Sequence, residues 1–243
     1  MLRILQVEIK KLYASKMWWL IAVGSVLPGL ITCLSFLQQR NISWLVFIHV
    51  ALLIFNVQSL LTFSAFAAFL CAREYEDNTI EIVLCYPYPK WYFLFAKLAI
   101  MFLIIGITLI LFGICTLCFG AFLLTSSLTS ALLLHFIKIL LLVLLMHFSL
   151  SPAVFLLADL TRMTISGVIY GIIGMCLCMM LYKTNFIQFI PTCIPFDLTD
   201  HILGMDVMKI LPSYSIHWSI LAVWFVLFLL INVNIRPSIY SRS

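Results

Sequence analysis

Long uninterrupted apolar segments limit what this 243-residue chain can fold into more than any other feature. Six of them follow one another along the sequence, at residues 17–37, 44–71, 91–124, 131–158, 163–182 and 216–235. Each reaches the roughly 20 residues that a helix needs to cross the hydrocarbon core of a bilayer. Because 65% of the residues are hydrophobic and only 9% are charged, a water-soluble globular protein is excluded. We therefore expect an integral membrane protein.

The same segments predict helices rather than strands. Strands of a membrane barrel would show short stretches in which apolar and polar residues alternate, and these runs of Leu, Ile and Phe do not alternate. A helix also satisfies its own backbone hydrogen bonds inside the bilayer. The sequence therefore predicts one all-α transmembrane domain over residues 1–243, with six transmembrane helices and little chain left outside the membrane.

The first sixteen residues predict a helix that lies on the membrane surface. Leu2, Leu5, Ile9 and Leu12 fall on one helical stripe, and charged residues occupy much of the remainder. The alternative is a positively charged stretch that only sets the topology. We expect no signal peptide, because the first apolar run is too long for one.

Basic residues predict which helix ends face the cytoplasm, because cytoplasmic segments are enriched in Lys and Arg. If the N-terminus is cytoplasmic, ten of the fourteen basic residues lie on that side. The ten are Arg3, Lys10, Lys11, Lys16, Arg73, Lys90, Lys97, Arg162, Arg236 and Arg242, and the other four are Arg40, Lys138, Lys183 and Lys209. We expect a multi-pass protein of the cell (inner) membrane with both termini cytoplasmic. The net charge of +5 then reflects topology and not binding to nucleic acid.

The longer cytoplasmic connection, residues 72–90, concentrates charge. Its charged residues are Arg73, Glu74, Glu76, Asp77, Glu81 and Lys90. Residues from Thr79 to Leu84 suggest a short amphipathic helix, which Pro87 and Pro89 would end. Such a helix is well placed to touch a soluble partner. A solvated turn that only anchors the topology fits the spacing equally well.

The longer outer connection, residues 183–215, is too apolar for a solvated loop. Pro191, Pro195 and Gly204 interrupt it, so it is also too broken to cross the membrane. We expect short re-entrant or interfacial helices in the outer leaflet, and a compact apolar loop packed on the spans is the alternative. Either arrangement covers the outer end of the helix bundle.

Residue patterns that would make this chain an enzyme are missing from the sequence. It contains no P-loop, no G-x-S-x-G and no H-E-x-x-H. No span carries an Asp or Glu at mid-membrane, which disfavours a proton- or sodium-coupled carrier. Cys115 and Cys118 have C-x-x-C spacing, but they lie in an apolar span without a nearby acid or His, which favours packing over metal or redox chemistry. Cys193 is the one cysteine that we predict in an outer loop.

The cytoplasmic connection carries a recognisable order of residues. Glu74 or Glu76 supplies an acidic position, and the residues that follow in order are Thr79, Glu81, Leu84, Pro87, Lys90 and Lys97. This order resembles the stretch between spans two and three of ABC-2-type transporter permeases, where a Gly-Thr-hydrophobic-Glu core precedes a Pro, a basic residue and a later Lys. Asn78 stands where that family has Gly, and Asn also tolerates a positive φ.

The resemblance implies an architecture and a mechanism. Permeases of this family have an amphipathic N-terminal helix, six spans and re-entrant outer helices between spans five and six. Two permease chains, identical or different, pair in the membrane, and each docks a cytoplasmic ABC ATPase. ATP and magnesium bind to that ATPase, so the resemblance implies no cofactor and no metal on this chain and no catalytic residue in it.

The resemblance also implies roles for particular residues. Residues expected to couple to the ATPase are Glu74, Glu76, Asp77, Thr79, Glu81, Leu84, Pro87, Asp159 and Arg162. Residues expected to line a translocation path at the dimer interface are Phe47, Phe55, Asn56, Gln58 and Ser59. A wall this apolar suits an amphipathic or lipid-like substrate, such as a membrane-active peptide.

A narrower resemblance concerns the substrate. The short chain, and Glu8, Lys10 and Lys11 just ahead of the first span, look most like permeases of the bacitracin-resistance and lantibiotic-immunity kind. This implies a bacterial exporter that confers resistance to an antimicrobial peptide. The alternative is a non-transporting immunity or sensor protein that binds a peptide toxin or an assembly partner through residues 186–211. A membrane-embedded enzyme is disfavoured because acid–base pairs are lacking.

Overall fold

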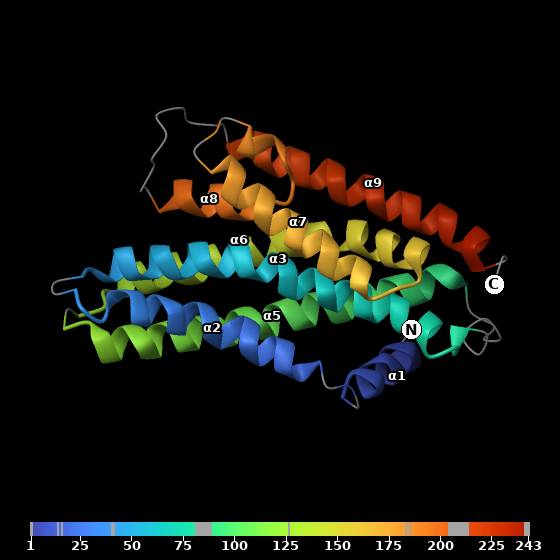
Figure 1. The fold of residues 1–243 in the computed structure, drawn as a ribbon, viewed down its shortest axis with the longest axis horizontal. Helices are drawn as coiled ribbons and strands as arrows, with labels where there is room; N and C mark the ends of the chain where they lie inside the picture. Colours follow the sequence, from blue (N-terminus) through green and yellow to red (C-terminus); the bar gives the residue numbers. More distant parts are fainter. Residues whose placement is uncertain are drawn as a thin grey trace.

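The computed structural model describes residues 2–13, 15, 17–39, 42–80, 89–125, 127–182, 184, 186–203 and 214–240. Every regular element within these ranges is a helix, which confirms the predicted all-α fold. The elements are α1 (Leu2–Tyr13), α2 (Trp18–Phe36), α3 (Trp44–Glu76), α5 (Lys90–Leu123), α6 (Ser130–Thr161), α7 (Ile165–Leu181), the 3-10 helix η1 (Ile187–Phe189), α8 (Ile194–Ile202) and α9 (Tyr214–Tyr240). The long helices run side by side along one axis (Figure 1).

Five of these helices are long and apolar enough to cross a membrane. They are α2, α3, α5, α6 and α9. The apolar helix α7 has 17 residues, at the lower end of the range of about 17–25 residues that spans a bilayer. Each of the six predicted spans coincides with one of these helices. Helix α3 is longer than the predicted span: it continues through residues 72–76 of the expected connection and so carries Glu74 and Glu76 on its last turns.

Helix α3 lies at the centre of the bundle and packs against α2, α5, α6, α7 and α8. Its first turn is capped by Ser43, whose Oγ accepts a hydrogen bond from the Val46 amide. Two glycines of α7 make the closest approach to it possible. A Cβ on Gly167 would overlap the Ser64 carbonyl oxygen, and a Cβ on Gly171 would lie 2.6 Å from the Leu61 Cα. Small residues on one helix face are a common way for membrane helices to pack closely.

The two ends of the bundle differ in what covers them. Helix α1 and the last turns of α3 and α9 lie at one end, and α8 lies at the other (Figure 1). Helix α8 packs on α3 and α6, with Ile194, Phe196 and Leu198 buried. The expected outer segment therefore contains one short α-helix and one 3-10 turn in its described part. Residues 204–213 of that segment lie outside the described residues. So do residues 81–84 of the short helix expected from Thr79 to Leu84.

Candidate functional site at the α1 end of the bundle

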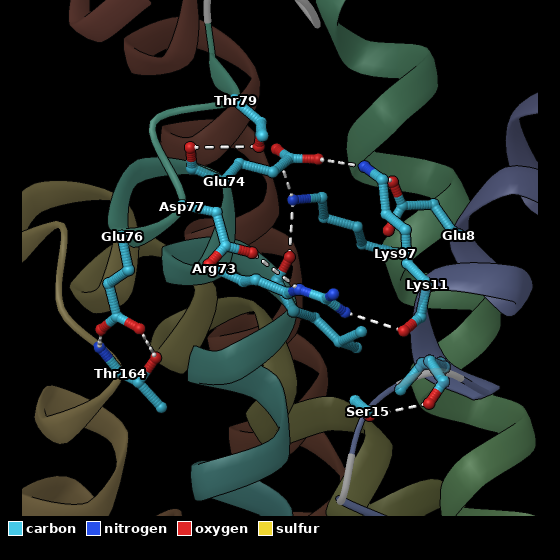
Figure 2. A network of polar contacts seen from close by, with 12 residues as sticks. Glu8, Lys11, Ser15, Arg73, Glu74, Glu76, Asp77, Thr79, Lys97 and Thr164 are labelled. Atoms are coloured by element: carbon cyan, nitrogen blue, oxygen red, sulfur yellow. Dashed lines mark hydrogen bonds and ion pairs between the residues drawn. The ribbon is translucent and has the colours of Figure 1, made fainter.

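Glu74, on the last turn of α3, is the centre of an ion-pair cluster. Its side chain is buried, with 4% of the residue exposed. Oε2 accepts a hydrogen bond from Lys97 Nζ at 2.8 Å, and Oε1 accepts one from Lys11 Nζ at 3.2 Å. Lys97 also donates to the Leu70 carbonyl at 2.6 Å. One carboxylate therefore joins α3 to both α5 and α1 (Figure 2).

The charges of this cluster balance one another. Lys11 Nζ also lies 3.0 Å from Glu8 Oε1, so two glutamates face two lysines. Glu8, Glu74 and Lys97 are all buried. Removing one partner of a buried ion pair typically costs about 3–5 kcal/mol, because the other charge stays buried and uncompensated. We name Glu8, Lys11, Glu74 and Lys97 the buried ion-pair cluster, and we expect its members to depend on one another.

Arg73 makes a second link between α3 and α1. Its Nη1 donates to the Lys11 carbonyl at 2.8 Å, and its Nε donates to Asp77 Oδ2 at 3.1 Å. The chain then leaves α3 through Asn78, whose φ of 53° is the left-handed value expected for a residue in a glycine position. The turn closes when the Thr79 amide donates to the Glu74 carbonyl at 3.0 Å.

Glu76 ties this turn to the one between α6 and α7. Its two carboxylate oxygens accept from the amide and the hydroxyl of Thr164, at 2.6 and 2.9 Å. A carboxylate is favourable there because Thr164 is the N-cap of α7, where backbone amides lack partners within the helix. Arg162, left-handed at φ 57°, ends α6, and its guanidinium lies 5.6 Å from the centre of the Tyr75 ring. The two connections expected to couple to a partner therefore meet.

The predicted coupling residues divide into an exposed and a buried group. Glu76, Asp77 and Arg162 are exposed, and Thr79 is half-buried beside them. Glu74 and Asp159 are buried, so they can position the turns but cannot form their outer surface. Glu81, Leu84 and Pro87 lie outside the described residues.

Sequence reasoning did not foresee the partners of Glu74. Lys97 is the only charged residue in the apolar segment 91–124, and a charge inside a membrane segment needs a partner in the protein. That rule could have pointed to an acid near the end of the neighbouring span. No comparable signal marked Lys11 or Thr164, because their contacts depend on how α1 and α7 pack.

The residues expected to line a path lie inside this chain. Phe47, Phe55, Asn56 and Ser59 are buried, and Gln58 is half-buried. The Phe55 ring stacks on Phe112 of α5, with ring centres 4.3 Å apart. The structure thus brings four of the five into the interior between α3 and its neighbours, and not onto an outer face of the chain.

Polar members of this set connect α3 to the helices around it. Asn56 Nδ2 donates to Thr199 Oγ1 of α8 at 2.8 Å, and Ser59 Oγ is hydrogen-bonded to His147 Nε2 of α6. Gln58 Nε2 donates to the Val23 carbonyl of α2 at 3.4 Å. Within the described part of the chain, no group of three or more His, Cys, Asp or Glu residues is arranged to hold a metal ion.

Comparison with known proteins identifies the family. A sequence profile of ABC-2 family transporter proteins matches residues 4–178, which include α2, α3, α5 and α6 and most of α1 and α7. No protein with a curated description matches the chain. The matched segment covers more than half of the sequence and the whole candidate site. The chain therefore belongs to the ABC-2 family of transporter proteins, as a multi-pass membrane permease that works with an ABC ATPase and is not itself the ATPase.

Proposed function

We propose that this permease is part of an ATP-driven exporter and that the exposed turns at the α1 end of the bundle receive the ATPase. The observation that carries the proposal is the contact of Glu76 with Thr164, since it holds two exposed connections together as one surface. Glu76, Asp77 and Arg162 give that surface charges of both signs. The same segment also contains Thr79 and, further along, Glu81, Leu84 and Pro87. ATP and magnesium bind to the ATPase, and this chain holds no cofactor.

The buried ion-pair cluster supports a route for movement from this surface into the membrane. Thr79 is hydrogen-bonded to the Glu74 carbonyl, and the Glu74 carboxylate is bound to lysines of α5 and α1. Buried opposite charges resist separation because neither can be solvated elsewhere. A displacement of residues 77–79 is therefore passed to three helices at once. Asp159, buried next to the end of α6, is a positioning residue in this scheme.

The substrate class is proposed from the resemblance to peptide-resistance permeases and from the apolar composition of the chain. Phe47, Phe55, Asn56 and Ser59 pack inside the chain, so they do not form an open wall for a substrate. We propose a peptide antibiotic or toxin that is moved out of the membrane or the cell. Two permease chains, identical or different, would assemble for this. Helix α1 and the end of α9 lie at the same end of the bundle, which supports both termini being on the cytoplasmic side of the cell membrane (Figure 1).

Charge reversal on the proposed surface tests the function. Glu76→Lys and Arg162→Glu should each lower co-purification with the ATPase and substrate-stimulated ATP hydrolysis at least tenfold. The matched control is Lys138→Glu, at an exposed position in the first half of α6 and away from the proposed surface. This variant should keep both the co-purification and the ATP hydrolysis. Unchanged binding and hydrolysis in both variants would overturn the docking surface. Peptide resistance that persists with an inactive ATPase would instead support a non-transporting immunity or sensor protein.

A further inference from the structure

A small cavity lies between α3, α6 and α7, at the depth of the membrane. The side chains around it come from all three helices and include Ser64 and Ala67 of α3, His147 and Ser151 of α6, and Tyr170 of α7. The remaining wall is apolar. About 20 Å³ of this space is open to the centre of a water molecule. The cavity is therefore large enough for a water molecule, which needs about 10–15 Å³, and too small for a drug-sized ligand.

Tyr170 brings an unpaired hydroxyl to the cavity. Its Oη atom is buried and has no hydrogen-bond partner in the described part of the chain. A buried polar group without a partner destabilises a fold, and inside a membrane no bulk water can satisfy it. His147 is different, because Nδ1 donates to the Val143 carbonyl at 3.0 Å and Nε2 is hydrogen-bonded to Ser59 Oγ. Among the polar groups around the cavity, the Tyr170 hydroxyl therefore has the greatest need of a ligand.

Two serine hydroxyls can complete the hydrogen bonds of a small ligand in the cavity. Ser64 Oγ donates to the Leu60 carbonyl, and Ser151 Oγ donates to the His147 carbonyl at 3.5 Å. Each hydroxyl has one proton, which these bonds use, and its oxygen keeps lone pairs that can accept. The cavity thus offers one donor on α7 and acceptors on α3 and α6. A water molecule has two protons and two lone pairs, so it matches this set.

We propose that the cavity binds one water molecule, which accepts a hydrogen bond from the Tyr170 hydroxyl and donates to Ser64 Oγ and Ser151 Oγ. Buried waters in proteins typically make about three hydrogen bonds to groups that would otherwise be unsatisfied. Cavities that stay dry are lined by apolar groups alone, and this one is not. The water joins α7 to α6 as well as to α3, on which α7 already packs through Gly167 and Gly171. This inference does not depend on the proposed export function.

Radiolytic labelling of the full-length protein in detergent micelles tests the site. A brief X-ray pulse converts a bound water to a hydroxyl radical, which oxidises the nearest aromatic ring, and mass spectrometry of the digested protein locates the added oxygen. Tyr170 should be labelled several-fold faster than Phe112, which is fully buried and stacked on Phe55. Ala67→Val fills the cavity and should lower the labelling of Tyr170 to the rate of Phe112. Equal rates for the two residues in the wild-type protein, or unchanged labelling of Tyr170 in Ala67→Val, would overturn the proposal.

Tyr170→Phe gives a second test that adds no bulk to the bundle and so remains available if Ala67→Val does not fold. The variant should have a lower thermal midpoint in detergent, because the bound water loses the hydroxyl that donates to it. Tyr92→Phe is the matched control, since the Tyr92 ring stacks on Trp91 at the start of α5, away from the cavity, and its midpoint should change little. A midpoint of Tyr170→Phe that is unchanged or raised would show that the hydroxyl has no partner and that the cavity is dry.

Discussion

Lys97 Nζ lies 2.8 Å from Glu74 Oε2, and both side chains are buried where α5 passes the end of α3. In the membrane segment that follows residue 90, Lys97 is the sole charge, and it is neutralised by an acid from the preceding span. The pair draws in α1 as well, because Lys11 binds the second oxygen of the same carboxylate. Three helices thus depend on one acidic side chain.

Lys97→Met should destabilise the protein by about 3–5 kcal/mol, because Glu74 would stay buried with Lys11 as its remaining lysine. The change is measured by thermal unfolding in detergent, with the loss of monodisperse protein as the signal of unfolding. Lys138→Met, at an exposed position of α6, is the control and should shift the midpoint little. The double variant Glu74→Gln with Lys97→Met should recover part of the loss. Additive effects of the two substitutions would show that the residues act independently.

Glu76→Gln should weaken the junction of the two turns by about 1.5–3 kcal/mol, since hydrogen bonds to a charged group are lost or replaced by neutral ones. Thr164→Val should cost less, because the Thr164 amide still donates to Glu76. Amide hydrogen exchange at the start of α7 is the measurement. Asp77→Asn changes a neighbouring exposed carboxylate that contacts Arg73, and it should leave exchange in α7 unchanged.

Asn78→Gly should be tolerated, because the φ of 53° at this position suits glycine at least as well as asparagine. Asn78→Val should destabilise the protein by about 1–2 kcal/mol, since a β-branched residue is strained in the left-handed region. Thermal midpoints of the two variants give the comparison. Equal thermal midpoints for the Asn78→Gly and Asn78→Val variants would mean that the chain leaves α3 with a different backbone conformation.

Gly171→Ala should lower stability by about 1–3 kcal/mol through overpacking, because the added Cβ would meet backbone atoms of α3. Gly174→Ala on the same helix is the matched control. There the nearest atom would be 3.6 Å away, an ordinary contact, so the substitution should be neutral or slightly stabilising. Thermal unfolding of both variants in the same detergent separates the effect of close packing on stability from the effect of helix propensity. A similar loss in both would argue against close packing at Gly171.

Much of the fold could be predicted, because long apolar runs identify membrane helices on composition alone. The end of α3 could not be predicted, since residues 73–76 are polar and a charged helical turn beyond the membrane has the composition of a loop. The position of Asn78 in a left-handed turn was predictable from the local residue order, and the structure confirms it. The contacts of Glu74 with Lys11 and Lys97, and of Glu76 with Thr164, could not be predicted, because they join residues far apart in the chain. Such contacts depend on lateral packing, which hydropathy does not encode.

The contact of Glu76 with Thr164 has a mechanical consequence when it is taken with the glycines of α7. Helices α3 and α7 are joined at one end by the Glu76 carboxylate and are packed closely along their length at Gly167 and Gly171. We therefore expect the two helices to move as one rigid unit. Relative motion between helices would then occur where this pair packs against the rest of the bundle.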